Sequence, residues 1–487
     1  MRTVPAEPTA TDDQSRRNYV AARRQRWNEI STALHQSGGL PRGYHARLQE
    51  IYHWLVPPGC RVLEAGCGTG DLLASLQPRH GVGVDLSPGM LAVARARHPN
   101  LELIEGDVQD LQLDQTFDFI ILSDLVNDLW DVQAVFERLL PLCHDGTRII
   151  LNAHSHLWRL PLAAAQRAGA ANRLLPQNWL TVDDVGNLLR LTGFETVRHW
   201  PEILCPVTIP GVSHVANRVL AKTWPFRIAA LTHMIVARPD PSRRPRRPAP
   251  SVSVIVPARN EAGNIEEIFR RVPAMGRETE LVFVEGHSRD DTLNAIHRAI
   301  AAHPERRCSV YQQTGEGKGD AVRLGFKQSS GEILMILDAD LTVAPEDLPR
   351  FADALHSGRG EFINGVRLVY PMEDEAMRFF NLLGNKFFSL TFSWLLGQPI
   401  KDTLCGTKVL WRDDYHQIVE GRSYFGNFDP FGDFDLLFGA AKLSRKIVEM
   451  PIRYRQRVYG ETNIRRWSHG WLLLKMSAFA ARRMKWV

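Results

Sequence analysis

Two aspartates directly follow a continuous apolar run in the second half of the chain. Residues 333–337 read Ile-Leu-Met-Ile-Leu, and Asp338 and Asp340 come next with one alanine between them. A buried strand that ends in this way places both carboxylates at the carboxyl edge of a sheet, close enough to share one Mg²⁺ or Mn²⁺. A cation held there would neutralise the diphosphate that leaves a nucleotide sugar. The structural alternative is that the acids cap a helix.

Three glycines in the first half follow another short apolar strand, predicted over residues 61–65. Gly66, Gly68 and Gly70 let the backbone approach a ligand closely at the carboxyl end of that strand. A second strand ends in Asp85, where a carboxylate can accept hydrogen bonds from both hydroxyls of a ribose. The glycine pattern alone also fits a nicotinamide dinucleotide site.

A third strand end favours one of these alternatives. Ile104-Glu-Gly-Asp107 is followed by the apolar strand 117–122, and residues 64–70 read ExGCGTG. This order of motifs resembles the class I S-adenosylmethionine-dependent methyltransferases over roughly residues 40–237. The resemblance implies an α/β, Rossmann-like fold with a seven-stranded, mostly parallel sheet and S-adenosylmethionine as cofactor. It implies that the cofactor-binding residues are Glu64, Gly66, Gly68, Gly70, Asp85 on the ribose, and Asp107 on the adenine side.

Methyl transfer requires alignment of the acceptor atom and, where that atom carries a proton, a base. His154 follows the strand predicted over residues 148–152 and is our candidate catalytic base. Further acceptor-side candidates are His156, Asp124, Asn127 and Asp128. Ordinary surface hydrogen bonding for the histidines and helix capping for the other residues are the structural alternatives.

The second half again alternates strands and helices, which predicts a second parallel α/β sheet. It begins with Val-Ile-Val-Pro-Ala-Arg-Asn-Glu at residues 254–261 and continues to the Asp-x-Asp pair. Together these motifs resemble the family 2 glycosyltransferases of the GT-A fold over residues 251–465. The nearest likeness is to dolichyl-phosphate mannosyltransferases and related polyprenyl-phosphate sugar transferases. A nucleotidyltransferase is the alternative.

This second resemblance implies roles for particular residues. The metal ligands would be Asp338 and Asp340. Arg367 and Lys408 match positions that contact acceptor or donor phosphates. The nucleotide-sugar-binding residues would be Pro257, Ala258, Arg259, Glu261, Glu285, Lys318 and Asp338.

The sequence departs from the family pattern at three places. Glu285-Gly286 replaces the usual Asp-Asp after the second strand, which leaves the nucleotide base open. Thr342 stands where a metal-ligating glutamine is common. Thr462-Asn463 replaces a glycine-lysine signature, so Arg465 or Arg466 would clamp phosphate instead.

The acceptor decides whether a general base is needed. A lipid phosphate is already an anion, so cations that position it suffice. A hydroxyl acceptor requires a carboxylate, and Asp433 and Asp435 lie where the family places such an acid. An amino-terminal helix cap is the alternative role for both.

A proline- and arginine-rich stretch divides the chain. Residues 238–250 contain five prolines and five arginines, which predicts an extended linker. We therefore expect an amino-terminal extension over residues 1–40, with 1–17 disordered, a methyltransferase domain over 41–237 and a glycosyltransferase domain over 251–464. A basic amphipathic segment would follow over 465–487.

Composition narrows the partners and the compartment. The net charge of +5 suits anionic ligands, and six scattered cysteines without a CxxC pair indicate neither a zinc site nor a disulfide framework. The chain begins without a secretory signal and has no run of 18 apolar residues, so we expect a cytoplasmic protein. The first domain lacks a basic face with interleaved aromatics, so no nucleic-acid partner is expected.

Two stretches favour peripheral contact with the inner face of the cytoplasmic membrane. Residues 379–396 are rich in Phe and Leu, and residues 465–487 combine tryptophans with six basic residues and no acid. Such segments suit a membrane interface, although a packing helix or a dimer contact is the rival interpretation.

The sequence thus predicts a bifunctional enzyme. One domain would transfer methyl groups, and the other would transfer a sugar from a nucleotide-sugar donor to a lipid-phosphate acceptor. The alternative is a glycosyltransferase that acts on a soluble hydroxyl acceptor, with a first domain that binds S-adenosylmethionine only to regulate.

Overall fold

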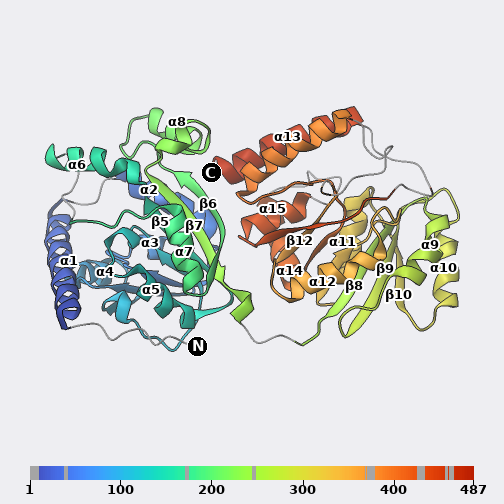
Figure 1. Cartoon of the computed structure of the whole chain (residues 1–487), viewed down its shortest axis with the longest axis horizontal. Helices are drawn as coiled ribbons and strands as arrows, with labels where there is room; N and C mark the ends of the chain where they lie inside the picture. Colours follow the sequence, from blue (N-terminus) through green and yellow to red (C-terminus); the bar gives the residue numbers. More distant parts are fainter. Residues whose placement is uncertain are drawn as a thin grey trace. The chain divides into compact units, whose positions relative to one another are not determined.

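The chain is seen in a computed structural model (Figure 1). The structure describes residues 10–37, 42–169, 175–243, 248–367, 369, 379–424, 434–455, 459 and 466–487. The chain divides into two compact units, Met1–Asp240 and Pro241–Trp486, which we take one at a time.

Unit 1 alternates helices and strands around one sheet. Its strands are β1 (Arg61–Ala65), β2 (His80–Asp85), β3 (Glu102–Glu105), β4 (Phe117–Leu122), β5 (Cys143–His154), β6 (Phe194–Glu202) and β7 (Thr232–Pro239). Its α-helices are α1 (Ala10–Ser37), α2 (Arg42–Leu55), α3 (Asp71–Ser75), α4 (Pro88–Arg97), α5 (Val132–Leu139), α6 (Arg159–Arg167), α7 (Val182–Leu191) and α8 (Val212–Arg218).

The seven strands of unit 1 lie in the order β3-β2-β1-β4-β5-β7-β6. All pairs are parallel except those of β7, which runs antiparallel to β5 and β6. Alternate residues point to opposite faces, so Leu63 packs in a core with α5 and α7, and Val62 packs in another with α2 and α3. The predicted seven-stranded, mostly parallel α/β sheet is confirmed.

Two predicted boundaries of unit 1 are wrong. Helix α1 begins at Ala10, so residues 10–17 are helical rather than disordered, because Arg16 and later side chains of α1 bind the domain. Strand β7 extends to Pro239, because Arg238 is only 3% exposed and pairs with Glu195. The expected linker therefore starts inside the sheet, and its residues 244–247 lie outside the described residues.

Unit 2 contains a second sheet with helices. Its strands are β8 (Ser251–Ala258), β9 (Glu278–Glu285), β10 (Arg307–Gln312), β11 (Ile333–Ile336), β12 (Phe362–Val366), β13 (Lys408–Trp411) and β14 (Ile447–Pro451). Its α-helices are α9 (Ile265–Arg271), α10 (Thr292–Ala302), α11 (Lys318–Gln328), α12 (Leu348–His356), α13 (Phe379–Leu396), α14 (Arg412–Glu420), α15 (Phe434–Lys442) and α16 (Arg466–Ala480).

The second sheet has the strand order β10-β9-β8-β11-β13-β12-β14 and is mixed. Strand β13 runs antiparallel to β11 and β12, so the prediction of a wholly parallel sheet is wrong at this place. A helix also lies between each later pair of successive strands, so the alternation of strands and helices does not reveal the direction of β13. Helices α9, α10 and α12 pack on one face, whereas α11 packs on the other, where Gly325 lies against Ile255 and Val284.

Helices α13 and α16 pack side by side in unit 2 (Figure 1). Trp394 and Trp486 meet edge to face there, with ring centroids 6.3 Å apart. Among the described residues, none of the helices combines the length and apolar character needed to cross a bilayer.

Candidate active sites

The loop between β1 and α3 in unit 1 exposes its backbone at the carboxyl edge of the sheet. Gly66 and Gly68 have φ of 72° and 52°, in the left-handed region that favours glycine. A Cβ on Gly68 would meet no atom within 4 Å, so open space adjoins this backbone. The third predicted glycine, Gly70, has φ of 71° and stands just before α3. The loop can therefore admit a ligand close to the main chain.

Asp85 is fixed beside this loop by main-chain donors. Gly68 N–H and Ser87 N–H each donate to its carboxylate at 2.8 Å. Burial raises the pKa of Asp85, and these donors oppose that effect. The arrangement joins the glycine loop to the carboxylate predicted to bind ribose.

The carboxylate of Glu64 is buried and hydrogen-bonded within the protein. Its carboxylate accepts a hydrogen bond from Leu73 N–H at 3.1 Å and is 2% exposed. Burial raises the pKa of Glu64 to about 8. The structure therefore places this acid beneath the loop, where it joins β1 to α3.

Asp107, the predicted adenine-side acid, lies under helix α1. It accepts from Gln109 N–H at 2.9 Å, and Arg16 of α1 donates to it at 3.3 Å. Arg16 also pairs with Asp110 at 2.7 Å. Sequence reasoning missed Arg16, because nothing local to residues 10–17 signals a contact some 90 residues away in the chain.

The acceptor-side candidates include a half-buried hydrogen-bonded cluster at the ends of β4 and β5. His154 Nε2 lies 3.4 Å from Asp124 Oδ1, and the hydroxyl of Tyr44 lies 2.7 Å from the same oxygen and 3.2 Å from Nε2. Asn152 also donates to Asp124 at 2.6 Å. Although burial opposes ionisation, the hydrogen bond and charge of His154 lower the pKa of Asp124 to about 2. Sequence reasoning missed Tyr44, which comes from α2.

The contacts of His154 leave one of its ring nitrogens unused. Its Nε2 faces Asp124 and Tyr44, whereas the buried Nδ1 has no hydrogen-bond partner within the described part of the chain. His156 is exposed, and Asn127 accepts from His154 N–H while donating to Asn178. Asp128 is held by Arg23 and Trp27 of α1. Of these candidates, His154 and Asp124 are the pair that could move a proton.

In unit 2, Asp338 and Asp340 follow β11 at its carboxyl end. Lys318, the first residue of α11, places its ammonium 2.7 Å from Asp338 Oδ1. Asp340 accepts from Thr342 N–H at 3.1 Å and from the Thr342 hydroxyl at 2.8 Å. Burial disfavours ionisation of Asp338, yet Lys318, Lys408 and Arg367 lower its pKa, so the carboxylate stays charged.

These acids fit a divalent cation by their chemistry. A Cβ on Gly406 would lie 2.1 Å from Asp338 Oδ2 and 2.3 Å from Lys318 Nζ, so glycine keeps this pocket of charged atoms open. Hard oxygen donors of this kind suit Mg²⁺ or Mn²⁺, with substrate phosphates and waters filling the remaining positions. Among the described residues, no group of three or more His, Cys, Asp or Glu is placed to hold a metal without such help.

The two cations predicted to contact phosphate are themselves held by the protein. Arg367 forms a two-point ion pair with Asp402, at 2.7 and 2.8 Å, and this pair raises the arginine's pKa despite burial. Lys408 is fully buried and donates to Cys405 O at 2.5 Å. Both therefore supply positive charge close to Asp338 from fixed positions.

Five of the predicted nucleotide-binding residues lie at or just after the ends of β8 and β9, whereas Lys318 and Asp338 lie at α11 and after β11. Pro257 and Ala258 close β8, and Arg259 follows as an exposed residue. Glu261 accepts from Asn264 at 2.8 Å, and Glu285 accepts from Ser288 N–H at 2.6 Å. The two acids thus hold the loops after β8 and β9.

Of the two candidate general bases for a hydroxyl acceptor, only one lies among the described residues. Asp433 lies outside the described residues. Asp435 is in the first turn of α15 and pairs with Arg422 at 3.0 Å. This ion pair gives Asp435 a structural role in α15.

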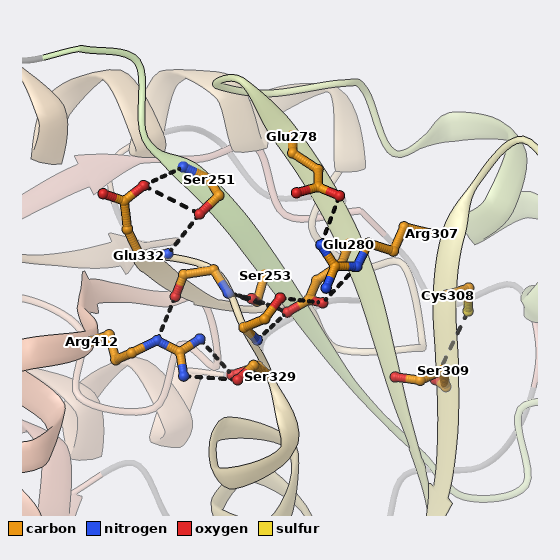
Figure 2. Close-up of polar contacts among 12 residues, drawn as sticks. Ser251, Ser253, Glu278, Glu280, Arg307, Cys308, Ser309, Ser329, Glu332 and Arg412 are labelled. Atoms are coloured by element: carbon orange, nitrogen blue, oxygen red, sulfur yellow. Dashed lines mark hydrogen bonds and ion pairs between the residues drawn. The ribbon is translucent and has the colours of Figure 1, made fainter.

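The opposite, amino edge of the same sheet has a different polar network (Figure 2). Glu280 accepts hydrogen bonds from Ser253 and from the loop before β11, and Arg412 donates to Gly331 O and Ser329 O. Charged and polar groups here bond to one another and tie strands to loops. The candidate chemistry therefore lies at the carboxyl edge.

Both units thus place polar and glycine-rich segments at the carboxyl ends of parallel strands, where open α/β sheets bind ligands. The comparisons with known families name the two classes. Residues 62–146 match the family described as "Methyltransferase domain", and residues 253–417 match "Glycosyl transferase family 2". The chain joins a methyltransferase domain to a family 2 glycosyltransferase domain, and the predicted recognition of both is confirmed.

Individual relatives match one half of the chain at a time. The chain is 30% identical over 242 residues to a dolichol-phosphate mannosyltransferase of Pyrococcus furiosus, covering 48% of this chain and 64% of that one. It is 23% identical over 215 residues to an undecaprenyl-phosphate 4-deoxy-4-formamido-L-arabinose transferase of Edwardsiella ictaluri, covering 43% and 62%. The chain therefore spans less than two thirds of either relative.

A solved structure resembles part of the chain. It is an S-adenosylmethionine-dependent methyltransferase of Thermotoga maritima, described as a possible histamine N-methyltransferase. It is 19% identical, covers 40% of this chain and 88% of its own, and gives a TM-score of 0.31.

Proposed function

We propose that the chain is a bifunctional enzyme. Its second unit would transfer a sugar from a nucleotide sugar to a polyprenyl phosphate, and its first would transfer a methyl group from S-adenosylmethionine. The observation that carries the proposal is the group formed by Asp338, Asp340 and Lys318 at the open end of β11. Two acids that can share a divalent cation, beside an ammonium, suit the diphosphate of a donor substrate.

Each residue of this group has a proposed task in sugar transfer. Asp338 and Asp340 would hold Mg²⁺ or Mn²⁺, which when bound offsets the charge of the departing diphosphate. Lys318 would turn from Asp338 to a donor phosphate, because a phosphate offers its ammonium a second anionic partner. Gly406 keeps the pocket free of a side chain.

A lipid phosphate is the acceptor that we favour. The named relatives are transferases whose names specify dolichol phosphate or undecaprenyl phosphate. An acceptor phosphate is anionic and needs no general base, which agrees with the pairing of Asp435 to Arg422. Arg367 keeps donor groups beyond those used by Asp402, and we assign them to the acceptor phosphate.

For methyl transfer we propose His154 as the base. Nδ1 would take the proton of the acceptor atom as that atom attacks the sulfonium methyl in line. Asp124 would then stabilise the charged imidazole through Nε2. The glycine loop and Asp85 would hold the cofactor so that its methyl faces the end of β5.

The direct test is sugar transfer by the full-length protein with a panel of nucleotide sugars, Mn²⁺ and a short polyprenyl phosphate. Products are identified by mass. We expect a metal-dependent glycosyl-lipid from the wild type and none from the Asp338→Ala variant. A donor that binds without yielding any lipid product would contradict the lipid acceptor.

We also propose that α13 and α16 contact a membrane surface. On α13, Phe387 and Leu390 are exposed, and on α16 Trp471 is 61% exposed beside Leu474 and Lys475. Apolar side chains among cations are what an anionic lipid surface binds. The opposite side of α16 packs into the unit through Leu473 and Met476, so the helix also has a packing role.

Vesicle sedimentation tests the membrane contact. The combined Trp471→Ala and Leu474→Ala change should weaken binding to vesicles of phosphatidylcholine and phosphatidylglycerol by about tenfold, because apolar area is lost from the interface. Leu160→Ala, at an exposed leucine on α6, is the matched control. Equal binding by all three proteins would exclude the contact.

A further inference from the structure

Gln313 has a buried amide oxygen that the fold leaves unused. It directly follows β10, is 4% exposed, and donates its backbone N–H to Glu285 O at 3.0 Å. Its Oε1 is buried and accepts no hydrogen bond within the described part of the chain. A buried polar atom left unpaired costs about 1–3 kcal/mol, so such exceptions point to a missing partner.

The position of Gln313 suggests where that partner binds. Ala258, Glu285 and Gln312 lie in register at the carboxyl ends of β8, β9 and β10. The residue that follows β9 is Gly286, and a Cβ there would lie 3.3 Å from Arg259 Cβ and 3.6 Å from Gln313 Nε2. The amide of Gln313 and the side chain of Arg259 therefore lie on either side of the bare backbone of Gly286.

The neighbouring acid is already occupied. Glu285 is 3% exposed, and its carboxylate accepts from Ser288 N–H at 2.6 Å and from Gln312 Nε2 at 3.4 Å. It thereby holds the turn after β9. The neutral amide of Gln313 at this edge still has hydrogen-bonding capacity for a ligand, because its Oε1 has no partner among the described residues.

This edge is continuous with the proposed diphosphate site. Strand β8 pairs with β11, which leads to Asp338, and with β9 on its other side. The distance from β11 to β10 is three strand spacings of about 4.8 Å each. A nucleoside diphosphate whose phosphates lie at Asp338 can lay its base across Gly286.

We propose that Gln313 reads the base of the nucleotide sugar and selects uracil over guanine. This inference rests on the proposed sugar transfer. One free acceptor matches the single imide N–H of uracil, and the amide NH₂ can donate to an adjacent carbonyl oxygen. Guanine presents N–H groups on adjacent atoms, which two carboxylate oxygens satisfy and one amide oxygen does not.

Calorimetric titration of the full-length protein with UDP and GDP, both with Mn²⁺, tests this assignment. We expect UDP to bind at least about tenfold more tightly than GDP, because a mismatched base leaves a buried partner unpaired. Gln313→Leu should remove most of that preference. Gln313→Glu, which supplies two acceptors, should shift it towards GDP, an effect that a merely structural role would not produce. Gln328→Ala, which removes an exposed amide at the carboxyl end of α11, should retain the UDP preference.

The outcomes separate this inference from the function on which it rests. Tighter binding of GDP by the wild type, or an unchanged UDP preference in Gln313→Glu, would overturn base reading while leaving sugar transfer intact. Failure of both nucleotides to bind the wild type would overturn the proposed function together with the inference. If Gln313→Leu does not fold, the direction of the change in Gln313→Glu decides the question.

Discussion

The acids at the carboxyl edges of the two sheets are held by different partners. In unit 1, Asp85 is bound by backbone N–H groups, and burial raises its pKa. In unit 2, Asp338 lies 2.7 Å from Lys318, and nearby cations lower its pKa. Main-chain donors leave a carboxylate able to accept from hydroxyl groups, whereas fixed cations suit phosphate and a metal. Two sheets of related topology thus suit different ligands, because different groups surround their acids.

Metal removal should separate the two sites most strongly. With a chelator such as EDTA, we expect sugar transfer to fall by about 10³-fold, because several kcal/mol of charge stabilisation is lost. Binding of S-adenosylmethionine, measured by calorimetry on the same sample, should not change. EDTA already saturated with Mn²⁺ is the control. Chelator-resistant sugar transfer would show that Asp338 and Asp340 act without a metal.

The Asp85→Ala variant tests the acid of unit 1 that is held by main-chain donors. Loss of a carboxylate that bonds the ribose hydroxyls should weaken S-adenosylmethionine binding by about 10- to 100-fold, as expected for hydrogen bonds to a charged group. Nucleotide-sugar binding in unit 2 should be unaffected. Asp183→Ala, at an exposed acid on α7, is the matched control. If Asp85→Ala retains full affinity, the ribose assignment is wrong.

The sequence predicted those parts of both sites that depend on contiguous residues. The glycine loop, Asp85 and the Asp338–Asp340 pair each follow an apolar strand, so local pattern located them. Arg16, Tyr44 and the Asp402 partner of Arg367 come from distant segments, and only tertiary packing brings them to the sites. The antiparallel direction of β13 was missed for the same reason, because a four-residue strand does not reveal its direction.

Glu64 offers a test of burial in unit 1. Its proton stays bound up to about pH 8 in the folded chain, but is lost near the ordinary pKa of 4.5 on unfolding. Stability therefore falls as the pH rises through this window, because the folded state binds more protons than the unfolded state. Glu64→Gln keeps an acceptor for Leu73 N–H without the charge. We expect it to stabilise the fold at pH 8 by about 4 kcal/mol and by about 1 kcal/mol at pH 5.

Thermal unfolding of the full-length chain at the two pH values measures this effect. Glu137→Gln, at an exposed acid on α5, should show no such pH-dependent gain. An equal change at pH 5 and pH 8 in Glu64→Gln would show that the carboxyl is not protonated in the folded state.

Arg16 is one exception to the comparison, since it gives an acid of unit 1 a cationic partner, as Arg23 does for Asp128. It is 30% exposed and lies 3.3 Å from Asp107, so the ion pair is weak and solvent-screened. If Asp107 accepts a hydrogen bond from the adenine amine, Arg16 competes for that carboxylate. Arg16→Ala should then tighten S-adenosylmethionine binding by no more than about fivefold. Arg17→Ala is the matched control, because Arg17 is 71% exposed on the same helix and pairs with Asp13. Weaker binding in Arg16→Ala alone would instead mean that α1 holds the cofactor in place through Arg16, and that unit 1 also uses a cation.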